Sequence, residues 1–588
     1  MNQEITGSEI VLKSLTDQGV DVVFGYPGGA VLPIYDSLFK QNSIKHVLVR
    51  QEAGAVHAAE GYAKSSGKVG VVLVTSGPGA TNIVTGLTDA MMDSVPIVCI
   101  TGQVPQHLIG SDAFQECDTT GITRPCTKHN YLVKDANKLS GVFHEAFMIA
   151  KDGRPGPVVI DIPKDVQFAK GIYKEQKDIS IPSHRLFVNQ ILENDNLIEE
   201  ATKLIANAEK PIFYIGGGCI NSGPQASKKV QEFVQLTGVP STMTLMGLGT
   251  LPASNSFSLG MLGMHGMYEA NLAMHDCDVM VNIGARFDDR VTGRLDAFSP
   301  NSKKIHIDIE ASNINKNIKV DVPIVGDVKH ILSKMIESWK KNKYSINKNN
   351  LDNWWQKINE WKKIDCLNFS QNGDSIKPQF AVKRLYELTK GLDTIITTEV
   401  GQHQMWAAQY YKFEKPNKWI TSGGLGTMGF GFPAAIGAQI ANPNALVIDI
   451  AGDGSILMNI QEMSTAVQHR LPVKIFILNN EYMGMVRQWQ ELLHGGRYSE
   501  SYMDSLPDFV KLAESFNAKG LRATKSDEVD KVIKEMIQFD GPVIADIIVD
   551  KEENCFPMIQ SGSAHNEMVL NKSQKQDEKS AEKGKILV

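Results

Sequence analysis

The 588-residue sequence lacks the features of several protein classes. Its 7 cysteines form no CxxC pair and are odd in number, which argues against a disulfide framework or zinc site and suits a reducing compartment. No apolar run approaches the roughly 18 residues of a membrane span, and the first residues, MNQEITGSEIVLKSL, fit neither a signal nor a transit peptide. A net charge of -6 argues against nucleic acid as the main partner.

Short apolar runs alternate with helical patterns along the whole chain, for example VGVVLVTSG, VPIVCITGQ, ALVIDIAGDG and VKIFILNN. Continuous Val/Ile runs of this length are typical of parallel strands buried on both faces. Their alternation with helices predicts an α/β protein built from doubly wound parallel sheets.

Two polar segments, around Tyr173–Asn196 and about Ser338–Asp374, are predicted to be linkers. They divide the chain into domains at 1–180, 190–345 and 370–550, followed by a C-terminal segment, 551–588, whose charged end beyond Asn571 is expected to be solvated. The first and third parts share one pattern: strand, Gly-x-Gly turn, helix, then Val-Pro or Leu-Pro and another strand. We therefore predict two copies of one domain on either side of a different one.

The stretch AGDGSILMN, followed by ILNNEYMGMVRQW, carries the strongest chemical signal. Glycines at a strand-to-helix turn let backbone N–H groups face a phosphate. Asp453 and Asn480 follow neighbouring predicted strands, and with a carbonyl near Tyr482 they offer the oxygen ligands that Mg²⁺ prefers. Taken alone, Asp453 reads as a helix cap and Asn479-Asn480 as a turn. Together they predict a Mg²⁺–diphosphate site.

The stretch VRQEAGAVHAAEGYAK places one acid, Glu52, beside a run of alanine and glycine. Small residues let another group approach the backbone closely, and a flat ring is the partner that we expect there. By itself Glu52 reads as an acid at a helix N-terminus. His57 and Gln115 are plausible cofactor neighbours, although His57 suits a core position equally well.

GDGS followed by NN resembles the cofactor motif of thiamine diphosphate-dependent enzymes. In that family another domain, usually from a partner subunit, binds the cofactor's pyrimidine ring, and a glutamate contacts this ring. The resemblance gives Glu52 that role. A carboxyl group hydrogen-bonded to the aminopyrimidine favours the imino tautomer, which removes the thiazolium proton, while the protein supplies position and electronic tuning.

Over about residues 5–565 the chain most resembles the catalytic subunit of the acetohydroxyacid synthase (acetolactate synthase) family. The supporting segments include GYPGGAVLPIYD, RQEAGAVHAAEGYA, TSGPGATN, GSDAFQE, ARFDDRVTG and TSGGLGTMGFGFPAAIGA. The resemblance implies three α/β domains: two thiamine diphosphate-binding copies and a middle FAD-binding one, with a lid formed by the C-terminal segment. It also implies decarboxylation of pyruvate and joining of the product to pyruvate or 2-ketobutyrate, the first common step toward valine, leucine and isoleucine.

The resemblance also supplies site residues. It places Gly29, Phe114 and Gln115 near the reacting carbon and Lys164 in the channel. Arg290 would bind the acceptor carboxylate and Trp489 would favour the larger acceptor; ion pairing within RFDDR and ordinary packing are the alternatives. The residues expected at thiamine diphosphate are Glu52, Gln402, His403, Gly426, Met428, Gly454 and Ser455, and those expected at Mg²⁺ are Asp453, Asn480 and Tyr482.

For the middle domain the resemblance implies FAD in a mainly structural role. By pattern alone the glycine turn of FYIGGGCINSG is a weak nucleotide signal because it is not GxGxxG. The residues expected at FAD are Arg154, Gly216, Gly217, Gly218, Thr244, Leu245, Leu262, Gly263, Met264, His265, Gly284, Arg286, Asp288, Arg290, Asp308, Ile309, Asp327 and Val328.

The sequence leaves four alternative functions to compare. A flavin-dependent pyruvate oxidase would use the same scaffold, but GSDAFQE and RFDDRVTG argue against it. Glyoxylate carboligase lacks the glutamate, a NAD-dependent dehydrogenase would need GxGxxG, and a binding scaffold would need no acid opposite a metal site. The family implies homodimers, often with a small regulatory subunit, in a bacterial cytoplasm or a chloroplast stroma.

Overall fold

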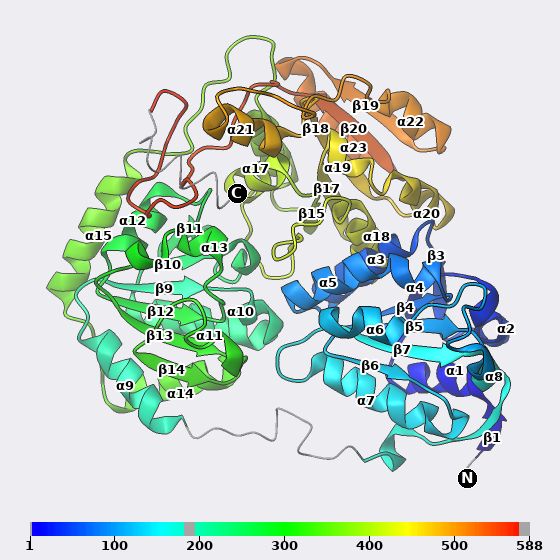
Figure 1. The fold of residues 1–588 in the computed structure, drawn as a ribbon. Helices are drawn as coiled ribbons and strands as arrows, with labels where there is room; N and C mark the ends of the chain where they lie inside the picture. Colours follow the sequence, from blue (N-terminus) through cyan, green and yellow to red (C-terminus); the bar gives the residue numbers. More distant parts are fainter. Residues whose placement is uncertain (1–2, 181–193, 575–588) are drawn as a thin grey trace.

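The computed structural model describes residues 3–180 and 194–574. The predicted linker Tyr173–Asn196 lies partly outside this range, and the predicted charged tail lies outside it from residue 575 onward. Figure 1 shows three α/β bodies around a common centre, each built on one sheet. The predicted fold class is confirmed, whereas the predicted domain boundaries stay predictions.

The N-terminal sheet has six parallel strands in the order β3-β2-β4-β5-β7-β6. Val71 and Leu73 of β4 pack into a core with α1 and α7, whereas Val72 and Val74 pack into another with α3 and α5. Both faces are covered, which explains the continuous apolar runs. The bounds are β2 Val22–Tyr26, β3 Lys45–Leu48, β4 Gly70–Val74, β5 Ile97–Gln103, β6 His129–Leu132, β7 Val158–Pro163, α1 Gly7–Asp17, α2 Leu32–Phe39, α3 Glu52–Ser66, α5 Val84–Asp93 and α7 Leu139–Lys151.

The C-terminal sheet repeats this topology in the order β16-β15-β17-β18-β20-β19. Numbered along the chain, both sheets read 2-1-3-4-6-5, so the predicted repeat is confirmed. The bounds are β15 Thr394–Thr398, β16 Trp419–Ile420, β17 Leu446–Gly452, β18 Lys474–Asn479, β19 Lys519–Ala523, β20 Val543–Ile548, α16 Pro378–Thr389, α17 Gln402–Tyr410, α18 Gly431–Ala441, α20 Met463–Gln468, α21 Gly484–Leu493, α22 Phe509–Ser515 and α23 Val529–Gln538.

The middle sheet is different, with the order β11-β10-β9-β12-β13-β14. Numbered along the chain this is 3-2-1-4-5-6, the order of dinucleotide-binding sheets, in which ligands bind where the order reverses, here between β9 and β12. The bounds are β9 Pro211–Ile215, β10 Ser241–Met243, β11 Ser258–Met261, β12 Val279–Ile283, β13 Lys303–Asp308, β14 Val322–Val325, α9 Asp195–Ala206, α11 Pro224–Thr237, α12 Tyr268–Asp276 and α14 Val328–Lys341. A small antiparallel pair, β1 Gln3–Thr6 and β8 Lys170–Tyr173, lies beside the N-terminal sheet.

The second predicted linker, Ser338–Asp374, is largely helical. Its start belongs to α14, and α15 (Lys348–Lys362) packs on the middle sheet. The indole N–H of Trp354 donates to the Pro211 carbonyl at 3.0 Å, and that of Trp355 donates to the Gly238 carbonyl at 2.9 Å. The polar residues of this helix lie on its outer face, and Trp354 and Trp355 pack on its inner face.

The alanine- and glycine-rich run of α3 meets a helix of the C-terminal body. A Cβ at Gly61 would lie 2.0 Å from the Ala434 carbonyl oxygen of α18, and one at Gly437 would lie 1.8 Å from the Ala58 oxygen. Figure 1 shows α3 and α18 side by side. Gly61 and Ala58 of this run therefore make room for a helix backbone, whereas a flat ring beside the run stays a prediction.

Candidate active site

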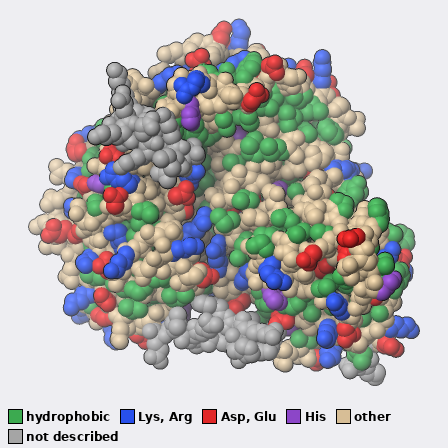
Figure 2. All heavy atoms as spheres, in the orientation of Figure 1, with side chains coloured by type: hydrophobic (Ala, Val, Ile, Leu, Met, Phe, Trp, Pro, Cys, Tyr) green, Lys and Arg blue, Asp and Glu red, His purple; other side chains and the backbone are tan. Residues whose placement is uncertain are grey.

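A cavity of about 1250 Å³ is lined by residues from all three bodies. Most of its lining comes from loops at the carboxyl ends of the middle and C-terminal strands, where open α/β sheets bind ligands. Figure 2 shows this face of the molecule, with a hollow near its centre and Lys or Arg side chains beside it.

The predicted metal residues meet at one end of the cavity. Asp453 follows β17 and Asn480 follows the adjacent β18, and both line the cavity together with Tyr482. The Asp453 carboxylate accepts the backbone N–H groups of Gly454 at 2.7 Å and Glu481 at 2.5 Å. Burial raises the pKa of Asp453 to about 7. A divalent cation would offset that burial cost, so these buried oxygen donors fit Mg²⁺.

His403 supplies an unused donor beside this group. Its ring is buried against Gly401 and Gly452, and its Nε2 has no hydrogen-bond partner. Burial lowers the pKa of His403 to about 3, so the ring is neutral and can donate one N–H. A phosphate oxygen would satisfy this buried atom. The other residues predicted at the diphosphate end also line the cavity: Gln402, Gly426, Met428, Gly454 and Ser455.

Glu399, which the sequence pattern did not single out, is a buried acid that lies behind the cavity wall. It follows β15, is fully buried and accepts the N–H groups of Gly429 at 2.6 Å and Phe432 at 3.0 Å, which fixes the turn after Met428. Burial raises the pKa of Glu399 to about 7. The sequence does contain a signal for Glu399, because this acid, like Asp453, directly follows a buried strand.

The middle sheet presents a cradle at the reversal between β9 and β12. A Cβ at Gly216 would lie 2.3 Å from the Gly284 oxygen, so glycine is required where the two turns approach. Arg154, from the N-terminal body, reaches the same cavity while donating to the Ser94 hydroxyl at 2.7 Å. These features fit a dinucleotide with a negatively charged pyrophosphate. Of the residues predicted at FAD, all but Gly216 and Gly263 line the cavity.

The predicted catalytic residues fall into two groups. Arg290 and Trp489 line the cavity, whereas Gly29, Glu52, Phe114, Gln115 and Lys164 do not. The latter five lie in segments that follow strands β2, β3, β5 and β7, at the carboxyl edge of the N-terminal sheet. Phe114 is 88% exposed. Within one chain, the structure therefore keeps this second group apart from the cavity.

Glu52 is half-buried at the first turn of α3. Its Oε2 accepts the side-chain N–H of Asn82 at 2.9 Å, and a Cβ at Gly79 would lie 3.6 Å from its Oε1. Gly79 belongs to α4 (Pro78–Asn82), the short helix that follows β4, and a Cβ on Gly77, which precedes this helix, would meet the Gln115 backbone. Glu52 and Gln115 therefore both lie beside the segment from Gly77 to Gly79.

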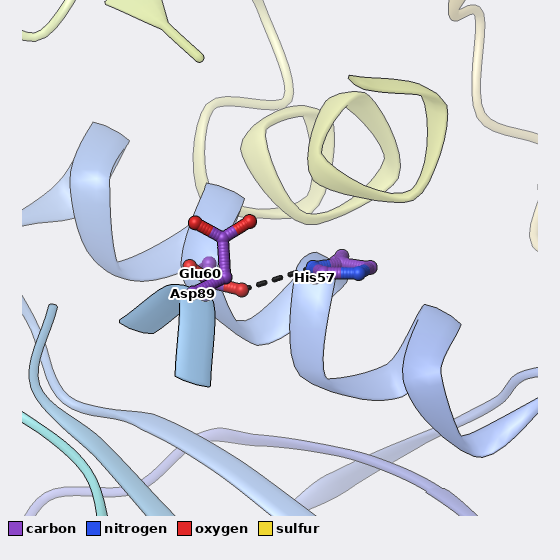
Figure 3. A group of neighbouring side chains, drawn as sticks. All are labelled: His57, Glu60 and Asp89. Carbon is purple, nitrogen blue, oxygen red and sulfur yellow. Dashed lines mark hydrogen bonds and ion pairs between the residues drawn. The ribbon is translucent and has the colours of Figure 1, made fainter. Parts of the chain in front are cut away.

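His57 lies in the core and not at the cavity. Figure 3 shows it with Glu60 and Asp89, which are contributed by α3 and α5, beneath α18. His57 Nδ1 lies 3.0 Å from Glu60 Oε1. Burial, reinforced by Asp89, holds the pKa of Glu60 well above its usual value, and burial lowers the pKa of His57 to about 3. The neighbouring cation is Lys64, which pairs with Asp93 at 2.8 Å.

The C-terminal segment crosses the middle body beside Arg290. Ile559 N–H donates to the Met264 carbonyl at 2.7 Å, and His565 Nε2 lies 2.6 Å from the Val291 carbonyl. Ser561 and Gly562 line a second cavity, of about 90 Å³, together with Arg290. The role of this C-terminal segment as a lid stays a prediction. Among residues 3–180 and 194–574, no helix has the length and apolar character needed to span a bilayer.

Comparisons with known proteins decide the family. Three family models match: the N-terminal TPP binding domain of thiamine pyrophosphate enzymes at residues 5–122, their central domain at 198–335 and their C-terminal TPP binding domain at 399–547. The chain is 48% identical over 577 residues to the acetolactate synthase large subunit of Haemophilus influenzae, covering 98% of this chain and 100% of that one. The chain belongs to the acetolactate synthase family.

Two further relatives show how widely acetolactate synthases of this type occur. The isozyme 3 large subunit of Escherichia coli is 47% identical, covering 97% of this chain and 99% of its own. The chloroplastic acetolactate synthase of Arabidopsis thaliana is 44% identical, covering 97% of this chain and 85% of its own. The matched acetolactate synthases therefore span all three bodies described above.

Proposed function

We propose that this protein is an acetolactate synthase large subunit. It decarboxylates pyruvate and joins the remaining two-carbon unit to a second pyruvate, giving 2-acetolactate, or to 2-ketobutyrate, giving 2-aceto-2-hydroxybutyrate. The observation that carries the proposal is the near-complete coverage of acetolactate synthases at 44–48% identity, with the metal and diphosphate donors gathered in one cavity.

Asp453, Asn480 and the Tyr482 carbonyl would hold Mg²⁺, and His403 would donate to the diphosphate. Thiamine diphosphate, when bound, would supply a weak carbon acid whose deprotonated form is the nucleophile toward pyruvate, and the electron sink that lets carbon dioxide leave. Glu52 would hydrogen-bond the pyrimidine ring and set its protonation. Because Glu52 lies outside the cavity of its own chain, it serves the cavity of a second copy.

Arg290 binds the carboxylate of the acceptor ketoacid, and Trp489 packs against its alkyl end. The Arg290 side chain is 56% exposed, and its Nε lies 3.6 Å from the Asp289 carboxylate, too far for a hydrogen bond, so the guanidinium is available to a substrate. The cavity residues at the carboxyl edge of the middle sheet would hold FAD. Because the net reaction transfers no electrons, its role there is structural.

The partners follow from the same reasoning. A homodimer completes two active sites, and the names of the relatives, which are large subunits, support a smaller regulatory partner. The location is a bacterial cytoplasm or a chloroplast stroma, since the relatives include both bacterial and chloroplastic proteins.

The test is an assay of purified protein with pyruvate, thiamine diphosphate, Mg²⁺ and FAD. We expect acetolactate and carbon dioxide in a one-to-one ratio, with loss of product when thiamine diphosphate or Mg²⁺ is omitted. Acetyl phosphate or peroxide in place of acetolactate would favour the pyruvate oxidase instead. Adding 2-ketobutyrate should divert product to 2-aceto-2-hydroxybutyrate.

A further inference from the structure

Glu462 links the C-terminal body to the segment that carries Glu52. It closes a short 3₁₀ turn, Ile460–Glu462, ahead of α20, and is 1% exposed. Its Oε1 accepts the backbone N–H of Arg50 at 2.9 Å, across 412 residues of sequence, and its Oε2 accepts the Thr465 hydroxyl at 2.7 Å. The carboxylate therefore reaches a main-chain donor of another body, two residues before Glu52.

The first turn of α3 is shaped around this carboxylate. A Cβ at Gly54 would lie 2.8 Å from Glu462 Oε1, so the carboxylate fits here because residue 54 is glycine. Between Arg50 and Gly54 stands Gln51, whose side-chain oxygen caps α3 by accepting the Ala53 and Gly54 N–H groups. Position 52 is thus enclosed between a residue held by Glu462 and a glycine packed against Glu462.

The same turn also reaches the cavity of its own chain. Asn459, whose carbonyl accepts the Glu462 N–H at 3.1 Å, donates through Nδ2 to the Gly429 carbonyl at 2.6 Å. Gly429 follows Met428, which lines the cavity. Three hydrogen bonds in series, Asn459 to Gly429, Glu462 to Asn459 and Arg50 to Glu462, therefore connect the cavity wall to the backbone before Glu52.

Close packing between the N-terminal and C-terminal bodies does not require a carboxylate. At the centre of the α3–α18 crossing, glycine and alanine achieve close contact without any charge. Burying a carboxylate costs free energy unless its oxygens are satisfied, and an apolar residue would close the same gap more cheaply. What the carboxylate adds is a directed acceptor for one particular N–H group.

We propose that Glu462 is a positioning residue for Glu52, fixing the start of α3 so that the Glu52 carboxylate meets the pyrimidine ring in the correct orientation. This inference rests on the proposed function, because it presumes that Glu52 acts on the cofactor. Glu462 itself touches neither cofactor nor substrate.

Three substitutions separate geometry from charge. Glu462→Ala removes the acceptor. Glu462→Asp keeps the charge but shortens the reach to Arg50, whereas Glu462→Gln loses the charge and keeps an oxygen of the same reach. Gln468→Ala is the matched control, since Gln468 accepts a hydrogen bond from the Arg50 side chain and not from its backbone.

Two readouts other than turnover are used. Amide hydrogen–deuterium exchange of peptides covering residues 47–56, in protein free of cofactors, reports whether the Arg50 N–H is held. Exchange of the thiazolium C2 proton, measured after acid quench in protein loaded with thiamine diphosphate and Mg²⁺, reports whether Glu52 acts on the ring. We expect Glu462→Ala and Glu462→Asp to slow C2 exchange at least tenfold and to lose protection of these peptides. Glu462→Gln and Gln468→Ala should stay within about threefold of wild type.

Wild-type C2 exchange in Glu462→Asp would overturn the proposal, as would a Glu462→Gln variant as slow as Glu462→Ala. If Glu462→Ala fails to fold, the Asp and Gln variants still decide. Glu52→Gln distinguishes the two levels of failure. Normal C2 exchange in Glu52→Gln would refute the role of Glu52 itself. Slow exchange in Glu52→Gln together with normal exchange in Glu462→Asp would refute only the positioning role of Glu462.

Discussion

At the scale of single residues, the acids of this protein occupy two kinds of surroundings. Asp453, Glu399 and Glu60 are buried, and burial raises the pKa of each. Glu52 is half-buried and has one neutral partner, Asn82. A carboxyl group that must share a proton with a ring needs an open side, and Glu52 has one.

Replacing Glu52 with glutamine should abolish most turnover while leaving the fold intact. The amide fills the same space and can still pair with Asn82, but it cannot exchange a proton with the pyrimidine. Proton transfer of this kind is worth about 10²–10⁴-fold in rate, so we expect kcat to fall at least 100-fold. Acetolactate formation measures this, and thermal unfolding checks the fold. Glu209→Gln, an exposed substitution remote from the cavity, is the control; turnover of Glu52→Gln within threefold of this control would refute the role.

Residues at strand ends could be predicted from sequence, and residues at contacts between bodies could not. Asp453 and Asn480 follow apolar runs with turn glycines, so local pattern places them at one sheet edge. Glu462 and Arg50 are 412 positions apart, and no local pattern pairs them. His57 looked suited to either cofactor or core, and only the packing of α3 against α18 resolves it.

At the scale of elements, the α3–α18 crossing joins the N-terminal and C-terminal bodies by backbone contact. Such a crossing requires residues without side chains at the closest points, and Gly61 and Gly437 occupy them. The sequence revealed the small residues but not their partner, because a run of alanine and glycine fits a ring as well as a helix. The segment that contains α15 looks like a linker in the sequence for a related reason: polar residues dominate it, and the burial of Trp354 depends on the middle sheet.

Gly437→Ala should destabilise the protein, although alanine is the better helix former. The new methyl group would lie 1.8 Å from the Ala58 oxygen, so α3 and α18 must separate. Overpacking of this kind costs about 1–3 kcal/mol, and more where backbone has to move. Gly141→Ala, in α7 with no atom within 4 Å of the new Cβ, is the matched control and should be neutral or stabilising by up to about 1 kcal/mol. Urea unfolding compares the two, and equal midpoints would contradict the packing argument.

At the scale of the whole molecule, the predicted active site is divided. The metal and diphosphate residues line the shared cavity from the C-terminal body, and Glu52 lies outside it at the carboxyl edge of the N-terminal sheet, where the segments that follow the strands also carry the exposed apolar side chains of Phe114 and Leu32. Exposed aromatic and aliphatic side chains near a half-built site are what an interface between two copies would cover. This arrangement makes a prediction about mixed dimers.

A heterodimer of Glu52→Gln and Asp453→Ala chains should regain activity that neither homodimer has. If each site takes its N-terminal edge from one copy and its metal residues from the other, one of the two sites in the heterodimer has both native residues, and about half of the wild-type activity returns. Two affinity tags isolate the mixed species for the acetolactate assay. A heterodimer of Glu52→Gln and Lys164→Ala should stay inactive, because both changes fall in the same body and each site then keeps one of them. If instead the whole site came from a single chain, every site in the first heterodimer would carry a damaged residue, and its activity would stay at the level of the parent variants.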